Sequence, residues 1–178
     1  MLSELGLSAT TVREIASRAG VHPALLHYYF KTKAGLFSVI MEETTRRLHG
    51  TLQTPPAPDS ASGKLGHLVR ACALVFSEDR YVPRLLLHEL VRPEHTQIFT
   101  LGIGELLSRQ LRGIVDLGIS SGEFKYRELP LPLSDIAPQL LCFFLMMPLG
   151  SSVPSGTQIE SWSQEVTQLV LHGLRGAV

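Results

Sequence analysis

The stretch TVREIASRAGVHPALLHYYF, residues 11–30, carries the signals for two short helices and the turn between them. Thr11 followed by Glu14 is a capping box, in which each side chain accepts a hydrogen bond from a backbone N–H group near the other, so a helix is expected to begin there. Gly20 stands where a left-handed residue ends a helix. Pro23 suits the first turn of the next helix, because its missing N–H group would have no partner there. These signals predict two helices separated by three residues, the spacing of a helix-turn-helix.

Each of the two short helices is expected to bury one side. In the first, apolar residues recur at helical spacing, and they are Val12, Ile15, Ala16 and Ala19. In the second, the residues expected to point inward are Leu26, Tyr29 and Phe30, and those expected to point outward are Ala24, His27 and Tyr28, flanked by Pro23 and Leu25. Such a helix fits the major groove of DNA, and Lys33 at the start of the next helix suits a phosphate. The alternative is a helical hairpin that only packs against the rest of the chain.

Composition describes a globular protein without a coat of positive charge. The chain has 178 residues, of which 44% are hydrophobic and 18% charged, enough to bury a core. The formal net charge is zero, but residues 1–50 carry six Lys and Arg against four Glu, so that the remainder is negative. The longest apolar run is about half of a membrane span and no secretory signal opens the chain, so a cytoplasmic protein without membrane contact is expected. Cys72 and Cys142 lack the spacing of a metal site and are expected to be buried free thiols, with no metal and no cofactor.

The remainder of the chain is expected to be helical, because no alternating run is long enough for a sheet. Apolar spacing predicts helices over residues 33–52, 65–79, 83–91, 95–117, 134–148 and 158–174. The linker TPPAPDSASG, residues 54–63, is the one plausible domain boundary. The sequence therefore predicts an all-α protein with a helix-turn-helix DNA-binding domain over residues 1–50 and a second helical domain over residues 51–178, for which the family resemblance given below implies effector binding and dimerisation.

The helix-turn-helix region resembles the DNA-binding domain of TetR-family transcriptional regulators. The stretch SELGLSATTVREIASRAGVHPALLHYYFKTKAGLF, residues 3–37, has the TTV, IA, AGV, YYF and KxKxxLF landmarks of that family in register. The resemblance implies a homodimer that binds a double-stranded DNA operator and a small-molecule effector. Carried over position by position, it implies DNA contacts by Thr10, Thr11, His22, Pro23, Ala24, Leu25, His27, Tyr28 and Lys33. Among these, the family's groove contacts fall on Pro23, Ala24 and Leu25, and its phosphate contacts on His27, Tyr28 and Lys33.

Two departures from the family pattern affect this domain. The family has a full helix before the position of Gly6, whereas Met1–Leu5 supply barely its last turn. We expect the natural chain to begin further upstream, and the alternative is a DNA-binding domain that is partly impaired. Without that cover, the inward side chains of the domain lose packing worth about 1.5 to 3 kcal/mol for each one left exposed. The groove-facing residues are also mostly apolar, so contact of Ala24 or Leu25 with a thymine methyl group is the expected base readout.

The effector pocket is expected between the helices of residues 65–148 and is expected to take a largely apolar ligand. Its candidate residues are Phe76, Leu86, His88, Phe99, Leu106, Phe143 and Met147, with His67 as a second polar candidate. Aromatic and Met side chains at this spacing are more often plain core than pocket wall.

Two apolar stripes near the C-terminus predict a dimer interface, the arrangement that the resemblance also implies. The stretch LLCFFLMM is apolar almost all round, and the last helix carries one apolar side. The interface residues expected are Phe144, Ile159, Trp162, Val166, Leu169 and Val170. The alternative is that both stripes pack inside one subunit.

A hydrolase and a dimer that does not bind DNA are the alternatives to a DNA-binding regulator. GISSG, residues 118–122, matches the G-x-S-x-G pattern of a hydrolase with Ser120 as nucleophile, but that motif needs a turn from strand to helix and the chain shows no sheet, so an enzyme is not expected. A helical ligand- or protein-binding dimer that has lost operator binding is the remaining alternative. The function expected is a repressor released from a palindromic operator by its effector.

Overall fold

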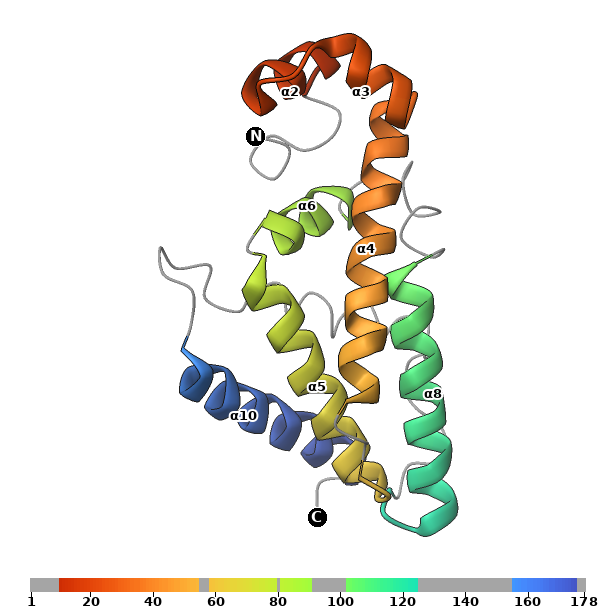
Figure 1. The fold of residues 1–178 in the computed structure, drawn as a ribbon. Coiled ribbons are helices and arrows are strands. Elements are labelled where there is room, and N and C mark those ends of the chain that lie inside the picture. The colour runs from red at the N-terminus through yellow and green to blue at the C-terminus, as the bar shows by residue number, and fades with distance from the viewer. Residues whose placement is uncertain (1–9, 55–57, 80, 91–101, 125–154, 176–178) are drawn as a thin grey trace.

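The computed structural model describes residues 10–54, 58–79, 81–90, 102–124 and 155–175, and every regular element in these ranges is an α-helix. The helices are α2 (Val12–Ala19), α3 (Pro23–Phe30), α4 (Lys33–Gln53), α5 (Ala61–Glu78), α6 (Tyr81–Leu90), α8 (Ile103–Ser121) and α10 (Gly156–Arg175). The predicted all-α class is confirmed. Figure 1 shows α2 and α3 at one end of the long helix α4, and α5, α8 and α10 gathered toward its other end.

Helix α4 joins the two parts of the molecule. Thr32 caps its first turn by accepting a hydrogen bond from the Gly35 N–H group, with 3.0 Å between Oγ1 and N. Further along, Phe37, Met41 and Leu48 are buried and belong to the same apolar cluster as residues of α5 and α8. One continuous helix therefore runs from the helix-turn-helix into the main core, across the domain boundary that the sequence predicts after residue 50.

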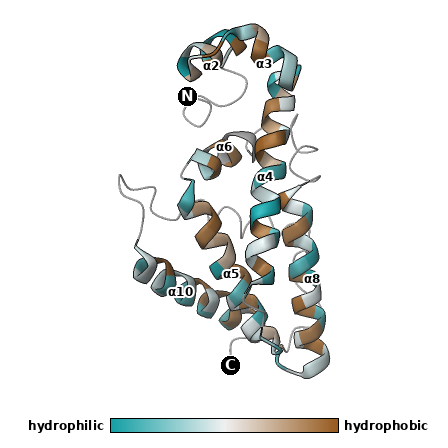
Figure 2. Cartoon of the chain, viewed as in Figure 1, coloured by the Kyte–Doolittle hydropathy of each residue, from teal (hydrophilic) through white to brown (hydrophobic). Residues whose placement is uncertain are grey.

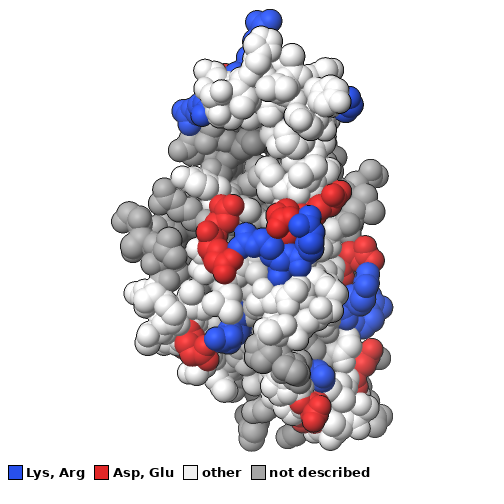
Figure 3. Space-filling view, viewed as in Figure 1, with Lys and Arg blue, Asp and Glu red and all other residues white. Residues whose placement is uncertain are grey.

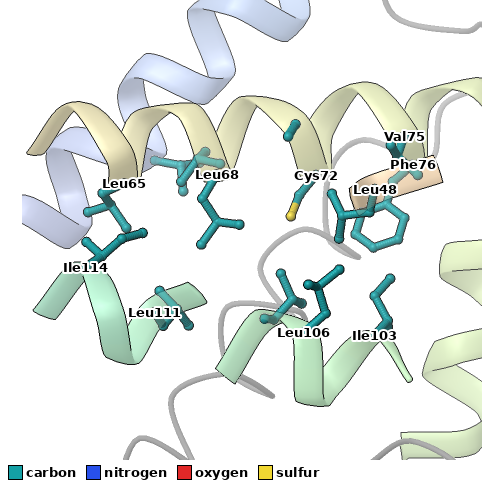
Figure 4. Packing of buried hydrophobic residues seen from close by; sticks show 14 of the residues in the cluster. Leu48, Leu65, Leu68, Cys72, Val75, Phe76, Ile103, Leu106, Leu111 and Ile114 are labelled. Carbon is teal, nitrogen blue, oxygen red and sulfur yellow. The ribbon is translucent and has the colours of Figure 1, made fainter. Parts of the chain in front are cut away.

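The main core lies between α4, α5 and α8. Figure 4 shows Leu65, Leu68 and Cys72 of α5 pointing toward the side chains of α8, with Leu48 of α4 and Phe76 at one end of the row. Fully burying a Leu or Phe side chain contributes about 1.5 to 3 kcal/mol, so this cluster dominates the stability of the second part of the molecule. Figure 2 shows the brown, hydrophobic residues distributed along all of these helices.

Cys72 lies inside this core. It is fully buried and has a free thiol, as predicted, and burial raises the pKa of that thiol. A neutral, desolvated thiol behaves as a small apolar side chain. Cys142 lies outside the described residues.

The turn after α8 fastens that helix to the start of α5. The Glu123 carboxylate accepts hydrogen bonds from the Ala61 and Ser62 N–H groups, both at 3.0 Å, and from the Ser62 hydroxyl at 2.8 Å. These bonds hold the pKa of Glu123 below its usual value, those from Ser62 contributing most. The N–H groups of the first turn of a helix favour a nearby negative charge, so the Glu123 carboxylate in the turn after α8 stabilises the start of α5.

Helix α10 packs on α5. Ile159 and Val166 are buried there, and the hydroxyls of Ser163 and Thr167 are buried as well. Both hydroxyls donate to backbone carbonyls of their own helix, which removes the cost of burying them unpaired. An exposed ion pair between Arg70 and Glu160, 2.7 Å from Nε to Oε2, adds a contact between the two helices.

Several helix boundaries differ from the predicted ones, and each difference has a physical cause. Helix α5 begins at Ala61, inside the predicted linker, because Ser60 and Glu123 cap its first turn. Helix α6 begins at Tyr81, before Pro83, since proline is tolerated anywhere in a first turn. Helix α8 continues to Ser121, where Gly122 with φ 77° ends it, instead of stopping at residue 117. The helix predicted over 134–148 and the start of the one predicted over 95–117 lie outside the described residues.

Within the described ranges, no helix is both long and apolar enough to cross a membrane. The same ranges contain no cluster of three or more His, Cys, Asp or Glu side chains that could bind a metal ion.

Candidate nucleic-acid interface

The predicted capping signals around α2 are confirmed atom by atom. The Glu14 N–H group donates to Thr11 Oγ1 at 3.2 Å, and the Thr11 N–H group donates to Glu14 Oε2 at 2.7 Å. The pKa of Glu14 lies below its usual value, chiefly because the Thr11 hydroxyl and backbone donate to it and less through the charges of Arg18 and Lys33. At the other end, Gly20 has φ 67°, and Val21 N–H donates to the Ala16 carbonyl at 3.0 Å, which is a Schellman motif.

The three residues between the helices turn the chain into α3. His22 precedes Pro23 as the N-cap residue of α3, and its Nδ1 accepts a hydrogen bond from the Ala24 N–H group at 3.2 Å. Acceptance at Nδ1 requires that this nitrogen carry no proton. His22, for which the resemblance implies a DNA contact, thus also fixes the start of α3.

Helix α3 presents an open outer face. Ala24, Leu25, His27 and Tyr28 are exposed, with 48% of Leu25 and 68% of Tyr28 accessible, whereas Pro23 is half-buried. None of the eight residues of α3 is fully buried. The side chains that the sequence directs outward are therefore accessible to a partner.

Two residues that the sequence directs to the buried sides of α2 and α3 are exposed in the structure. Tyr29 is 70% exposed, because its ring packs edge-on against Tyr28, with the centroids 5.1 Å apart, instead of entering the core. Ala19 is exposed because it is the last residue of α2, where the chain already turns away. Ile15, Leu26 and Phe30 are half-buried around a crevice between α2, α3 and α4. Residues 1–9 lie outside the described part of the chain.

The threonines before α2 are already engaged within the protein. Thr10 is fully buried, and its carbonyl oxygen accepts a hydrogen bond from Lys33 Nζ at 2.7 Å. Thr11 is exposed, but its hydroxyl and its N–H group both serve the capping box. The implied backbone contacts of Thr10 and Thr11 with DNA stay predictions.

Positive charge is concentrated at this end of the molecule. Residues 10–33 contain four Lys and Arg against one Glu, a net charge of +3 from Arg13, Arg18, Lys31 and Lys33 against Glu14. In Figure 3 the α2–α3 end is largely white and its charged atoms are mostly blue, in separate patches, whereas red and blue lie side by side across the middle of the molecule. A locally basic end on a neutral protein suits a phosphate backbone.

The joint between α3 and α4 holds a feature that sequence reasoning missed. Lys31 has φ 61° and ψ −51°, and the Thr32 N–H group donates to the Phe30 carbonyl at 2.6 Å, which closes a γ-turn around Lys31. Its Nζ lies 5.3 Å from the centroid of the Tyr28 ring, within the range of a cation–π contact. The two lysines of KTK, residues 31–33, mark a basic joint, but nothing in that sequence predicts a positive φ at Lys31.

The structure places three of the effector candidates in the main core. Phe76, Leu86 and Leu106 are buried and belong to the cluster between α4, α5 and α8. His67 lines an open groove between α5 and α10, and its Nε2 lies 3.0 Å from the Leu52 carbonyl oxygen. The side chain of His88 and the residues Phe99, Phe143 and Met147 lie outside the description. The effector site stays a prediction.

The apolar stripe of α10 is divided between the subunit's own core and solvent. Ile159 and Val166 are buried in the subunit's own apolar core, and Trp162 and Val170 are partly buried beside it. Leu169 is 59% exposed. Phe144 lies outside the described residues.

Ser120 lies in the last turn of α8, not on a strand-to-helix turn. Its hydroxyl donates to the Leu117 carbonyl at 2.9 Å. The G-x-S-x-G match is therefore the end of a helix closed by Gly122.

Three comparisons with known proteins agree with this geometry. A family model for bacterial regulatory proteins, tetR family, matches residues 1–40. The probable HTH-type transcriptional regulator YttP of Bacillus subtilis (strain 168) is 31% identical over 154 residues, which cover 83% of this chain and 71% of YttP.

Two solved structures share the fold at low identity. A putative fatty acid metabolism regulator of Clostridium perfringens matches with a TM-score of 0.74 at 21% identity, over 99% of this chain and 94% of that chain. FadR from Bacillus subtilis, solved in complex with stearoyl-CoA, matches with a TM-score of 0.69 at 22% identity, over 97% of this chain and 92% of that chain.

Proposed function

Because the chain belongs to the TetR family of bacterial regulatory proteins, we propose that it is a transcriptional repressor that leaves a palindromic operator when a small, largely apolar effector binds. Membership of the family makes it a transcriptional regulator with a DNA-binding helix-turn-helix. The operator, the effector and the sign of the response belong to the proposal.

The observation that carries the proposal is the open outer face of α3 at the end of the molecule. Leu25 and Tyr28 are exposed on a helix with no fully buried residue, and residues 10–33, which include this helix, carry a net charge of +3. In the proposed complex α3 enters the major groove, where Ala24 and Leu25 touch thymine methyl groups. His27 and Tyr28 bind phosphates on either side of the groove.

The release step rests on α4. This helix is packed into the core at Met41 and Leu48, and its other end carries the helix-turn-helix. An effector held among the helices of the second domain would favour a dimer in which the two copies of α3 no longer match two half-sites one helical turn apart. The complex of FadR with stearoyl-CoA supports a largely apolar effector for a protein of this fold.

A selection from random double-stranded DNA tests the proposal. The purified chain should enrich palindromic sites whose half-site centres lie about 10 base pairs apart. On such a site, Tyr28→Phe should weaken binding to all sequences alike, because it removes a phosphate contact. Leu25→Ala should change the preference at one thymine position. Both effects are measured in a gel-shift titration at several salt concentrations.

The alternative predicts a different result in the same experiment. If the chain is a ligand- or protein-binding dimer that has lost operator binding, the selection will enrich no site. Leu25→Ala and Tyr28→Phe will then bind random DNA as the unmodified chain does. That outcome contradicts the proposed repressor.

A further inference from the structure

Lys33 makes a contact that joins two ends of the helix-turn-helix domain. It is the first residue of α4, and its ammonium donates to the Thr10 carbonyl oxygen, 23 positions earlier in the chain, at 2.7 Å. The bond is partly buried, and Thr10 itself is fully buried. A buried carbonyl without a partner costs free energy, and a charged donor forms one of the stronger hydrogen bonds in proteins.

The bond from Lys33 to Thr10 holds the start of α2 in place. Thr10 directly precedes Thr11, the cap of α2, whose N–H group and hydroxyl are held by Glu14. The start of α2 is therefore fastened from two sides, by Glu14 of its own first turn and by Lys33 of α4.

The other end of the domain is attached to the same turn of α4. A Cβ atom added to Gly35 would collide with the Phe30 carbonyl, so the end of α3 lies directly against the first turn of α4. Thr32 caps that turn through the Gly35 N–H group. The first turn of α4 thus touches both the beginning of α2 and the end of α3.

We propose that Lys33 serves operator binding as a positioning residue, because its bond to the Thr10 carbonyl fixes the start of α2 to α4. The proposal rests on the DNA-binding function proposed above and adds a role for one residue in it. With Lys33 in place, α2, α3 and the first turn of α4 move as one rigid body. A change in the tilt of α4 then changes the orientation of α3 by the same amount.

The first experiment measures the fastening without DNA. Hydrogen exchange at the Glu14 and Ile15 amides, which bond to Thr11, is followed by NMR in the unmodified chain and in Lys33→Met. Lys33→Met keeps the length of the side chain and removes the donor, so exchange at these amides should rise about tenfold. Lys33→Arg keeps a charged donor and should restore most of the protection. Lys31→Met removes a neighbouring cation that does not touch Thr10, and it should leave these amides unchanged.

The second experiment measures what the positioning contributes to operator binding. A lost phosphate contact lowers the slope of log K against log [salt] by about 0.9 in each half-site, so its effect fades at high salt. On a selected operator, Lys33→Met should therefore remain about tenfold weaker than Lys33→Arg at high salt, where the charge of the side chain contributes least.

Either of two results overturns the proposal. One is unchanged exchange at the Glu14 and Ile15 amides in folded Lys33→Met, with folding checked by circular dichroism. The other is equal operator binding by Lys33→Met and Lys33→Arg at high salt, because the whole effect of Lys33 on binding would then be its charge. Failure of the proposed function looks different, because the unmodified chain would then show no operator binding while the exchange result would still stand.

Discussion

Lys31 combines a strained backbone with an exposed charge. Among the described residues it alone has a positive φ without being glycine. A γ-turn with positive φ costs a residue with a side chain about 1 to 3 kcal/mol, whereas glycine adopts it freely. Because glycine would avoid this cost, a lysine at the joint between α3 and α4 indicates that its side chain contributes to DNA binding or to the packing of the joint.

Replacing Lys31 separates the strain from the charge. Lys31→Gly should raise the free energy of unfolding by about 1 kcal/mol, because it removes the strain and loses only an exposed cation–π contact. The same variant should weaken DNA binding if the cation faces a phosphate. Urea unfolding and a gel-shift titration measure the two effects. Lys31→Ala is the control, because it loses the cation but keeps the strain, and equal stability of the two variants would contradict the argument.

At the residue scale, the sequence predicted contacts between close neighbours and missed those made over a distance. The capping box of Thr11 and Glu14 and the turn at Gly20 depend on residue types a few positions apart, and both are confirmed. The positive φ of Lys31 has no such signal, because glycine or asparagine is the residue expected there. The partner of Lys33 lies 23 positions away, and only the folded domain brings the two together.

Two glycines of α4 allow a matched test of how the groove helix is mounted. Gly35 faces the Phe30 carbonyl so closely that an added Cβ would displace backbone, whereas Gly50 has nothing within 4 Å of that position. Gly35→Ala should therefore destabilise the helix-turn-helix by about 1 to 3 kcal/mol. Gly50→Ala should stabilise α4 by about 0.5 to 1 kcal/mol, because alanine is the better helix former. Thermal unfolding compares the two, and a stabilising Gly35→Ala would show that α3 and α4 are not in close contact.

The attachment of α5 to the turn after α8 should depend on pH through Glu123. Its pKa is lowered from the usual 4.5, first by the bonds from Ser62 and then by that from Ala61, so the folded protein binds the proton more weakly than the unfolded chain. The stabilising contribution is therefore complete above about pH 4.5 and is lost as the pH falls through the lowered native pKa. Glu123→Gln should be less stable than the unmodified chain at pH 7, and the difference should shrink toward pH 3. Urea midpoints across that range measure it, and a difference that stays constant would exclude the ionised carboxylate as the cause.

At the element scale, helices with local caps were predicted well and helices with distant caps less well. The end of α2 at Ala19 and the start of α3 at Pro23 follow from neighbouring residues and agree with the structure. The start of α5 was placed four residues too late, because Glu123, 62 positions from Ala61, completes its cap. Apolar spacing identified the helices, but it carries no information on a cap supplied by another part of the fold.

At the scale of the whole molecule, a repressor of a palindromic operator needs two copies of α3 related by a two-fold axis. Apolar spacing alone could not divide the stripe of α10 between its own subunit and a partner. The structure packs Ile159 and Val166 into the subunit's own core and leaves Leu169 59% exposed. Among the predicted interface residues that the structure describes, Leu169 is therefore the one that can be changed without disturbing the subunit's own core.

Leu169→Arg is the test of the dimer that follows from this division. An arginine in an apolar interface between subunits would be desolvated without a partner, so the variant should be monomeric at about ten micromolar, where the unmodified chain should be dimeric. Its circular dichroism spectrum should be unchanged, because Leu169 contributes little to the core of its own subunit. Val166→Arg is the contrasting variant, since Val166 is only 2% exposed and a charge there should unfold the subunit itself. Sedimentation velocity measures the mass, and operator binding measures the consequence, because a monomer engages one half-site instead of two about 34 Å apart. A folded Leu169→Arg that remains dimeric and binds the operator with full affinity would place the interface elsewhere than on this side of α10.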